Sequence, residues 1–431
     1  MRKIFILLVS TLLILSSCKE NVKAQVDDKT DIVQEDEVNN LNDTELNSAA
    51  AYYNRSLAKY ESKDYKGAIA DLNKSIALDP NDADAYNNRG IAKRNLEDYK
   101  GAIADYNKAI EINPNFADAY NNRGIVKDNL KDYKGAIADY TKAIEIDPND
   151  ASAYYNRGIV KDDLKDYKGA ISDYTKAIEI NPNYAEAYYN RGVAKYYLKV
   201  YKGLIADYDK AIEINPNYAG AYYNRGVAKY DLKDYKGAIS DFTKAIEIDS
   251  NFADAYYNRG SAKSDLEDYK GAISDNTKAI EIDPNYAEAY SNRGIAKKEL
   301  KDYKGAIADY TKAIEIDPNF ADAYYNRGAL KYYLKDYKGA IADLNKAIEI
   351  NPNYASAYNN RGVVKDNLKD HKGAIADYTK AIEINPNDAS AYYNRGVAKA
   401  LLGNINAACQ DARKSQELGN DASKLIKIVC N

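Results

Sequence analysis

The sequence predicts an all-α solenoid, a stack of many copies of one helix–turn–helix unit. Three observations predict it. The 431-residue chain copies itself every 34 residues from Ala49 onward. All nine prolines fall at the thirty-second place of the unit, and 20 of the 23 glycines fall at the eighth or nineteenth place. Each unit holds two stretches whose apolar residues have helical spacing. Eleven units fit without a gap, starting at residues 49, 83, 117, 151, 185, 219, 253, 287, 321, 355 and 389.

The unit spanning 83–116 shows what is expected of each copy. Its first helix carries Tyr86 and Gly90, four residues apart, and its second helix carries Ala102. Asp98 is a suitable N-cap for the second helix, and Pro114 ends that helix. Because glycine within a helix costs about 1 kcal/mol relative to alanine, we expect Gly90 to face Ala102 where the two helices approach closely.

Capping boxes are expected at the start of the first helices. Asn115 with Asp118, and Asn183 with Glu186, have the spacing in which the two side chains satisfy each other's backbone N–H groups. Gly101 recurs in the units without an evident reason in the sequence.

The chain resembles the tetratricopeptide repeat family over residues 49–422, at the places of Tyr86, Gly90, Ala102, Tyr106, Ala109 and Pro114. It departs from the family pattern at Arg89 and Lys93. Since Arg89 and Asp105 have counterparts in all eleven units, we expect a structural Arg–Asp pair between the helices. The resemblance implies a right-handed superhelix whose first helices line a concave face, and residues 423–431 suit a closing helix.

The N-terminal residues predict export and lipid anchoring. Arg2 and Lys3 precede an apolar run over 4–15, which is too short to span a bilayer but suits a signal peptide. The run ends at Cys18 in a segment that resembles a bacterial lipobox. This resemblance implies that residues 1–17 are removed and that Cys18 is lipidated. A simple signal peptide or an N-terminal membrane helix is the alternative.

Residues 18–48 are then an acidic tether, because they lack the large apolar residues needed for a core. The resulting location is the envelope of a bacterial cell, in the outer membrane or periplasm.

Composition argues against several classes of function. The formal charge of −4 comes from nearly balanced acids and bases, so nucleic-acid binding is not expected. We expect no metal site and no cofactor, because the acids recur as helix caps and the glycines follow the repeat. We also expect no enzyme activity. The single histidine, His371, stands where nine other units have tyrosine and is interpreted as a packing residue.

Tyrosines outside the framework places predict a ligand-binding groove. The chain has 43 tyrosines, and 13 of them lie on first helices in a stripe turned away from the expected packing face. An asparagine follows the first tyrosine place of this stripe in every unit. Surface tyrosines without a function are the alternative. The residues expected to bind are Tyr189, Tyr196, Tyr197, Tyr223, Tyr230, Tyr325, Tyr332, Tyr333, Asn190, Asn224 and Asn326.

Two further predictions concern single units. Cys409 and Cys430 form a disulfide, since export places them where disulfides persist; two buried thiols are the alternative. The seventh unit is a soft point, because Ser250, Ser261 and Asn276 replace a proline, an aliphatic residue and a tyrosine.

The sequence therefore predicts a lipid-anchored scaffold that binds a protein or peptide partner. A glycan- or peptidoglycan-binding lipoprotein is the alternative, because tyrosine faces and asparagine amides also suit sugars.

Overall fold

The computed structural model describes residues 48–430, in which every regular element is a helix and no strand occurs. The predicted signal peptide, Cys18 and most of the acidic tether lie outside these residues. No helix within 48–430 has the length and apolar character needed to cross a membrane. The 23 helices are α2 (Ala49–Glu61), α3 (Tyr65–Leu78), α4 (Ala83–Asn95), α5 (Tyr99–Ile112), α6 (Ala117–Asn129), α7 (Tyr133–Ile146), α8 (Ala151–Asp163), α9 (Tyr167–Ile180), α10 (Ala185–Tyr197), α11 (Tyr201–Ile214), α12 (Ala219–Asp231), α13 (Tyr235–Ile248), α14 (Ala253–Asp265), α15 (Tyr269–Ile282), α16 (Ala287–Glu299), α17 (Tyr303–Ile316), α18 (Ala321–Tyr333), α19 (Tyr337–Ile350), α20 (Ala355–Asn367), α21 (His371–Ile384), α22 (Ala389–Leu401), α23 (Ile405–Glu417) and α24 (Ser423–Val429).

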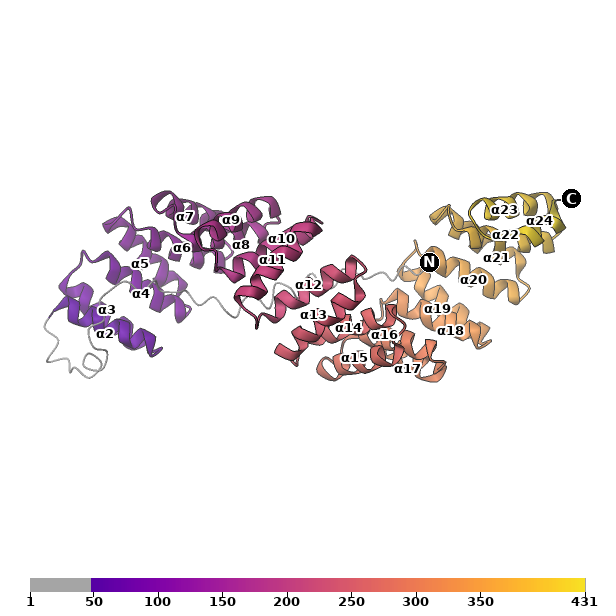
Figure 1. Cartoon of the computed structure of the whole chain (residues 1–431), viewed down its shortest axis with the longest axis horizontal. Coiled ribbons are helices and arrows are strands. Elements are labelled where there is room, and N and C mark those ends of the chain that lie inside the picture. The colour runs from indigo at the N-terminus through magenta and orange to yellow at the C-terminus, as the bar shows by residue number, and fades with distance from the viewer. Residues whose placement is uncertain (1–47, 431) are drawn as a thin grey trace. The chain divides into compact units, whose positions relative to one another are not determined.

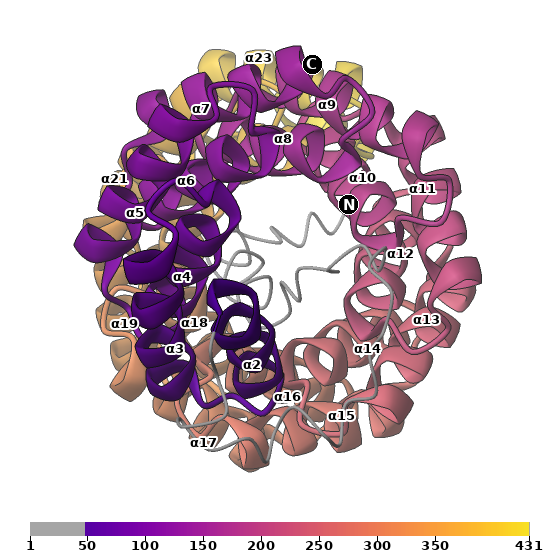
Figure 2. The same ribbon diagram turned by 90° about the vertical axis from the view of Figure 1, so that its left-hand side faces the viewer.

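The all-α tandem architecture predicted from the sequence is confirmed. Helices α2 to α23 form consecutive antiparallel pairs, and each first helix begins at place 1 of a unit and each second helix at place 17 (Figure 1). The chain divides into a block that ends at Pro148 and a block that begins at Asn149. Within the second block, the first helix of each pair lies on the inner side of a right-handed curve, as Figure 2 shows for α10, α12, α14 and α16.

Nine of the eleven second helices begin as predicted, at an aspartate N-cap. The Oδ1 atom of Asp98 accepts a hydrogen bond of 2.9 Å from the backbone N–H of Gly101. A Cβ atom on Gly101 would lie only 2.1 Å from Asp98 Oδ2. The repeated glycine at this place therefore makes room for the capping carboxylate, which the sequence alone did not explain.

The capping boxes predicted for the first helices are wrong. The N-cap residues are Phe116 and Tyr184, one place after the predicted Asn115 and Asn183, and neither makes a side-chain cap bond. The reason is a competing contact: the ring of Tyr184, the last residue of unit four, packs 4.7 Å from the ring of Tyr155 on the first helix of that unit. This ring packing occupies the place that a cap would need.

In seven of the eleven helix pairs the core is an aromatic ring placed over a glycine, whereas units one, nine and eleven have Leu72, Leu344 and Ala412 at the place of the ring. Tyr106 is fully buried, and a Cβ atom on Gly90 would lie 2.6 Å from its ring. The prediction that Gly90 faces Ala102 is therefore wrong, because the Tyr106 ring lies against the glycine. Unit seven differs, since Asn276 takes the place of the ring, is 1% exposed, and leaves its Oδ1 without a hydrogen-bond partner in the described chain.

The predicted Arg–Asp pairs are present in all eleven helix pairs. In the fifth pair, Arg191 donates two hydrogen bonds to Asp207, at 3.1 and 2.6 Å, and Lys195 donates a third at 2.6 Å. Arg191 also reaches Thr175 of the preceding unit, at 3.1 Å. A carboxylate with three charged donors is well satisfied, so these arginines have a structural role.

The C-terminal helix α24 closes the array against α23. Leu425 and Val429 are buried against Ala408 and Ala412. Cys409 and Cys430 are bonded to one another, with their Cα atoms 5.0 Å apart. The bridge joins the closing helix to the last helix pair.

Candidate functional site

The first tyrosine place of the predicted groove is occupied by structural residues. In the second block, a tyrosine at place 5 accepts a hydrogen bond from the asparagine at place 6 of the next unit. Asn190 donates to Tyr155 and Asn224 donates to Tyr189, both at 2.9 Å. The hydroxyl of Tyr223 accepts from Asn258 at 2.8 Å. Since each bond links residues 35 apart, these tyrosines hold successive units together.

The prediction that Tyr189 and Tyr223 line a ligand-binding groove is therefore wrong. Tyr189 and Tyr223 are 3% and 6% exposed, and their rings pack 4.7 Å from Tyr218 and Phe252. Burial raises the pKa of Tyr223 well above its usual value. These rings and the amides bonded to them offer little free surface to a ligand.

The predicted groove residues of unit nine are of two kinds, half-buried and exposed. Tyr325 is half-buried and accepts a hydrogen bond from Asn360 at 3.1 Å. Asn326 is half-buried next to it, and the preceding unit has Ser291 where a tyrosine would stand. By contrast, Tyr333 is 65% exposed.

Free aromatic surface occurs instead where the first helix turns into the second. We call the residues at places 12, 13, 14 and 17 of each unit the turn edge. A tyrosine at place 12 packs against the tyrosine at place 17 of its own unit, as Tyr196 does against Tyr201 at 6.2 Å. A tyrosine at place 13 packs against place 17 of the preceding unit, as Tyr197 does against Tyr167 at 4.8 Å.

Four rings at the junction of units four and five form a continuous series, which we call the tyrosine cluster: Tyr167, Tyr197, Tyr196 and Tyr201. All four are only half-buried. The Tyr196 hydroxyl donates to Asp231 at 3.0 Å, and burial together with this carboxylate raises the pKa of Tyr196. Tyr230 donates in the same way to Asp265, at 2.5 Å. The predicted site residues at places 12 and 13 thus do reach the surface, although Tyr196 and Tyr230 also bridge two units.

Val200 borders the tyrosine cluster and breaks the pattern of the repeat. It stands at place 16, where nine units have an aspartate N-cap, and it is 49% exposed. Helix α11 consequently begins without a side-chain cap bond. Loss of such a cap typically costs about 1 kcal/mol. An exposed valine in place of a stabilising aspartate is the kind of local exception that functional surfaces show.

Asp162 lies beside the same cluster. It is at place 12 of unit four, and its Oδ1 atom is buried without a hydrogen-bond partner among residues 48–430. Burial, with a smaller effect of Asp163, raises the pKa of Asp162 to about 7. The pKa values of Tyr167 and Tyr197 are raised by burial and also by the charge of Asp162.

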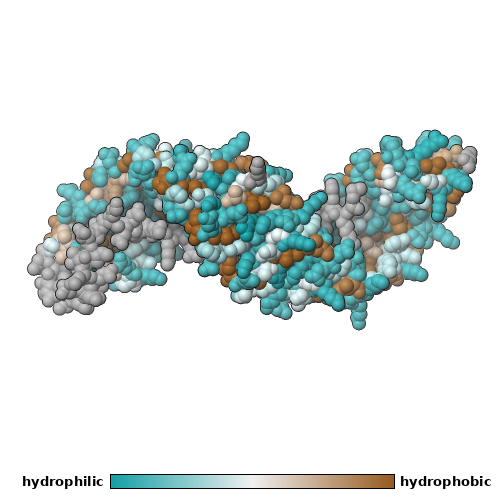
Figure 3. Space-filling model, in the orientation of Figure 1, coloured by the Kyte–Doolittle hydropathy of each residue, from teal (hydrophilic) through white to brown (hydrophobic). Residues whose placement is uncertain are grey.

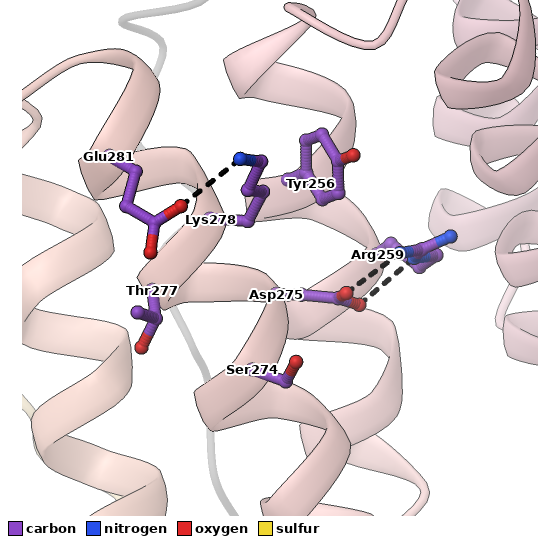
Figure 4. Close-up of a pocket in the computed structure, with 7 residues that line it drawn as sticks. All are labelled: Tyr256, Arg259, Ser274, Asp275, Thr277, Lys278 and Glu281. Carbon is purple, nitrogen blue, oxygen red and sulfur yellow. Dashed lines mark hydrogen bonds and ion pairs between the residues drawn. The ribbon is translucent and has the colours of Figure 1, made fainter.

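A polar hollow of about 360 Å³ lies beside α14 and α15, and Figure 4 shows the residues that line it. Arg259 faces Asp275 there, and Lys278 pairs with Glu281 at 3.1 Å. These are the ion pairs that recur along the array, so the hollow belongs to the repeated framework. Within residues 48–430 no cluster of three or more histidine, cysteine, aspartate or glutamate side chains could hold a metal ion. His371 lies with its Nδ1 atom 2.5 Å from Asp366, at the start of α21.

The repeats of the chain match a known protein family. Seven stretches of 34 residues, more than half of the chain, match the family described as tetratricopeptide repeat, at residues 83–116, 117–150, 151–184, 219–252, 253–286, 287–320 and 321–354. The chain belongs to the tetratricopeptide repeat family. Further matches to repeats of this type cover residues 57–96, 173–197, 201–233, 344–376 and 367–403. No curated protein matches the sequence.

Solved tetratricopeptide repeat structures resemble parts of the chain. YrrB, described as having an unusual peptide-binding site, is 32% identical, with 43% of this chain and 95% of YrrB covered and a TM-score of 0.38. Yeast Tom70 is 16% identical over 88% of this chain and 94% of its own, with a TM-score of 0.44. A tetratricopeptide repeat protein from Parabacteroides merdae is 19% identical over 57% of this chain and 99% of its own, with a TM-score of 0.47.

Two candidate functional residues beside the tyrosine cluster do not follow from the sequence analysis. Val200 and Asp162 were not predicted, although Val200 is detectable as the single apolar residue at place 16. Asp162 carries no such signal, because aspartate also occupies that place in units three and ten. Its pKa is raised by burial and by Asp163, and its charge also acts on Tyr197 of the next unit.

Proposed function

We propose that the protein is a scaffold that binds a protein or peptide partner, and that the partner docks on the turn edge at the tyrosine cluster. The observation that carries this proposal is Val200. Helix α11 lacks its side-chain cap and exposes an apolar side chain at the place where four tyrosine rings gather. Tyrosine-rich surfaces next to exposed apolar groups are typical anchors of protein interfaces.

Unit nine offers a second, smaller surface of the same kind. Tyr333 packs 5.2 Å from Tyr303, and Tyr332 packs 5.9 Å from Tyr337. Figure 3 shows that apolar residues reach the surface in separate patches among polar ones. Two aromatic surfaces on one array suit a partner that extends along several repeats.

A role without catalysis is part of the proposal. The strongly charged side chains of the described repeats form the recurring Arg–Asp–Lys groups and the Lys–Glu pairs on the second helices, such as Lys210 with Glu213. Members of this family act mainly through binding. The binding surface is therefore the feature to test.

We further propose that the scaffold is exported and lipid-anchored through Cys18, at the bacterial envelope. Support comes from the N-terminal sequence: two basic residues, a short apolar run, and small residues directly before the cysteine. Replacing Cys18 with alanine in cells should leave the signal segment uncleaved, and mass spectrometry should find no acyl chains. Unchanged processing and detergent partitioning would reject the anchor.

The docking surface is tested by crosslinking in cells followed by purification of the full chain. Tyr197→Ala should lower the amount of crosslinked partner at least about fivefold, because it removes the half-exposed ring that joins two units. Leu401→Ala is the matched control: it alters an exposed residue at the same place of the last unit and should have no effect. Equal recovery with both variants would contradict docking at the cluster.

The glycan alternative is tested in the same experiment. If envelope polysaccharide is retained by the wild-type chain and lost with Tyr197→Ala, while no protein is crosslinked, the ligand is a glycan. That result would overturn the proposed protein partner and leave the surface in place.

A further inference from the structure

Asp162 is surrounded by a group of residues that has no function in the repeat itself. It lies near the end of α8, next to Asp163 in the chain, and close enough to Tyr167 and Tyr197 for its charge to raise the pKa of both. These two rings are almost parallel, with an interplanar angle of 8° and centroids 4.8 Å apart. The covered Oδ1 atom has no donor in the described chain, whereas the side chain as a whole remains partly exposed.

The same place in unit ten shows how this chain satisfies such an acid. There Asp366 lies 2.5 Å from Nδ1 of His371, a basic side chain at place 17 of the same unit. In unit four, place 17 is Tyr167, whose side chain carries no positive charge. Asp162 therefore lacks the basic neighbour that Asp366 has.

Unit eight shows the opposite arrangement. Lys298 occupies the place of Asp162 next to a similar tyrosine pair, Tyr303 and Tyr333, and its ammonium pairs with Glu299 at 3.2 Å. Place 12 thus holds a lysine paired with an acid in unit eight, whereas in unit four it holds an acid whose Oδ1 atom has no hydrogen-bond partner in the described chain.

We propose that Asp162, with Tyr167 and Tyr197, forms an acceptor for a lysine or arginine side chain of the bound protein partner. The carboxylate supplies a charged hydrogen-bond acceptor, and the ring faces attract a cation and cover its aliphatic stem. The exposed carboxylate of Asp163 adds negative charge beside the acceptor. This inference rests on the proposed function, and it specifies the chemistry of the partner: a basic residue flanked by apolar ones that contact Val200.

The environment of Asp162 fits this role. Burial holds its pKa near 7, so the carboxylate is only partly ionised at neutral pH until a cation binds. A bound cation favours the ionised form and lowers this pKa. Binding should therefore strengthen as the pH rises from about 6 to 8, because Asp162 loses its proton over that interval.

Isothermal titration of the purified full chain tests the acceptor without a cellular partner. The probe is a ten-residue peptide of alternating lysine and serine, compared with the same peptide carrying acetylated lysines. The wild-type chain should bind the lysine peptide at least about tenfold more tightly than the acetylated peptide. Asp162→Asn should reduce this ratio to about one-third or less and remove the increase between pH 6 and 8.

The matched control is Asp366→Asn, which removes an acid at the same place that already has a basic partner. It should bind the lysine peptide as the wild type does. A carbodiimide, which joins amines to carboxylates in contact, should couple the peptide to Asp162 in the wild-type chain. Wild-type affinity in Asp162→Asn, or coupling confined to other carboxylates, would overturn the proposal. Loss of the lysine-peptide preference in Asp162→Asn together with undiminished partner capture by Tyr197→Ala would count against the proposed function and leave the cation acceptor in place.

Discussion

Units five and seven both depart from the repeat, but in different parts of the structure. Unit five departs at its surface, where Val200 replaces a capping aspartate and Tyr196 and Tyr197 occupy the turn edge. Unit seven departs in its core, where Asn276 replaces a buried ring and Ser261 replaces an aliphatic residue. The comparison indicates that exceptions on the surface concern binding and exceptions in the core concern local stability. The predictions below test each half of that statement.

The largest effect on stability is expected when Asn276 in the core of unit seven and Tyr310 in the core of unit eight are each replaced by the other residue type. Tyr310 is fully buried against Gly294, so Tyr310→Asn should destabilise unit eight by about 3–5 kcal/mol. Asn276→Tyr should stabilise unit seven by about 1–3 kcal/mol, because Gly260 leaves room for a ring and the unpaired Oδ1 is removed.

Hydrogen exchange with peptide resolution measures both changes, since units of a linear array open separately. In the wild-type chain, residues 250–280 should exchange faster than the units on either side. Asn276→Tyr should slow them to the rate of their neighbours. Uniform protection of all units in the wild-type chain would show that the core exception has no energetic consequence.

The next effect concerns the pH dependence of stability at the tyrosine cluster. The pKa of Asp162 is raised to about 7 by burial and by Asp163, with Tyr167 and Tyr197 packed nearby. Because the folded chain holds this proton between about pH 4 and 7, the contribution of Asp162 to stability is largest below pH 4 and is lost as the pH rises through 7. Asp162→Asn should therefore stabilise units four and five by about 1–2 kcal/mol at pH 8 and have little effect at pH 4.

Urea unfolding at the two pH values checks this, with hydrogen exchange of residues 151–214 to localise the change. Asp366→Asn is again the useful comparison, because it removes a hydrogen bond and should not stabilise the chain at pH 8. A stabilisation by Asp162→Asn that is the same at both pH values would contradict a titrating carboxylate.

A smaller difference in stability is expected between substitutions of a tyrosine at place 5 and of a tyrosine at place 13. Tyr189→Phe removes the acceptor for Asn224 at a buried position, which should cost about 1 kcal/mol or somewhat more. Tyr333→Phe alters an exposed hydroxyl and should change stability by less than about 0.5 kcal/mol. Thermal unfolding of both variants measures the difference. Similar losses in the two variants would mean that place 13 is as structural as place 5.

Places 5 and 13 also show which features of the structure can be predicted from the sequence and which cannot. The 34-residue period predicts the helix pairs, and the Arg89–Asp105 pair follows because both residues recur with every unit. The stripe that contains Tyr189 is correctly assigned to the first helix, but its burial is not predictable from that helix alone. It depends on Tyr218 at the end of the same unit and on Asn224 of the next unit, 29 and 35 residues away. A periodicity argument identifies one face of a helix, whereas these residues pack through the contact between units.

The capping-box prediction is wrong for a similar reason. Asn115 has the right spacing for a capping box, yet the N-cap is Phe116. In the second block the equivalent residue, Tyr184, packs on the ring of Tyr155, 29 residues earlier on the preceding first helix. Local sequence signals identify the end of a helix to within a residue, and packing against distant residues decides which side chain occupies the cap.

The central claim is that Val200 is exposed for binding at the expense of stability. Val200→Asp tests it most directly, because it restores the aspartate N-cap that nine other units have, with Gly203 in the place where the capping carboxylate is accommodated. The variant should be more stable than the wild type by about 0.5–1.5 kcal/mol, so that a loss of function cannot be attributed to unfolding. Asp98→Val, the reverse change in unit two, should cost a similar amount and leave binding intact. Measured together, unfolding and partner capture should move in opposite directions for Val200→Asp, with stability higher and capture at least about fivefold lower. A Val200→Asp chain that is more stable and still captures its partner fully would contradict the account.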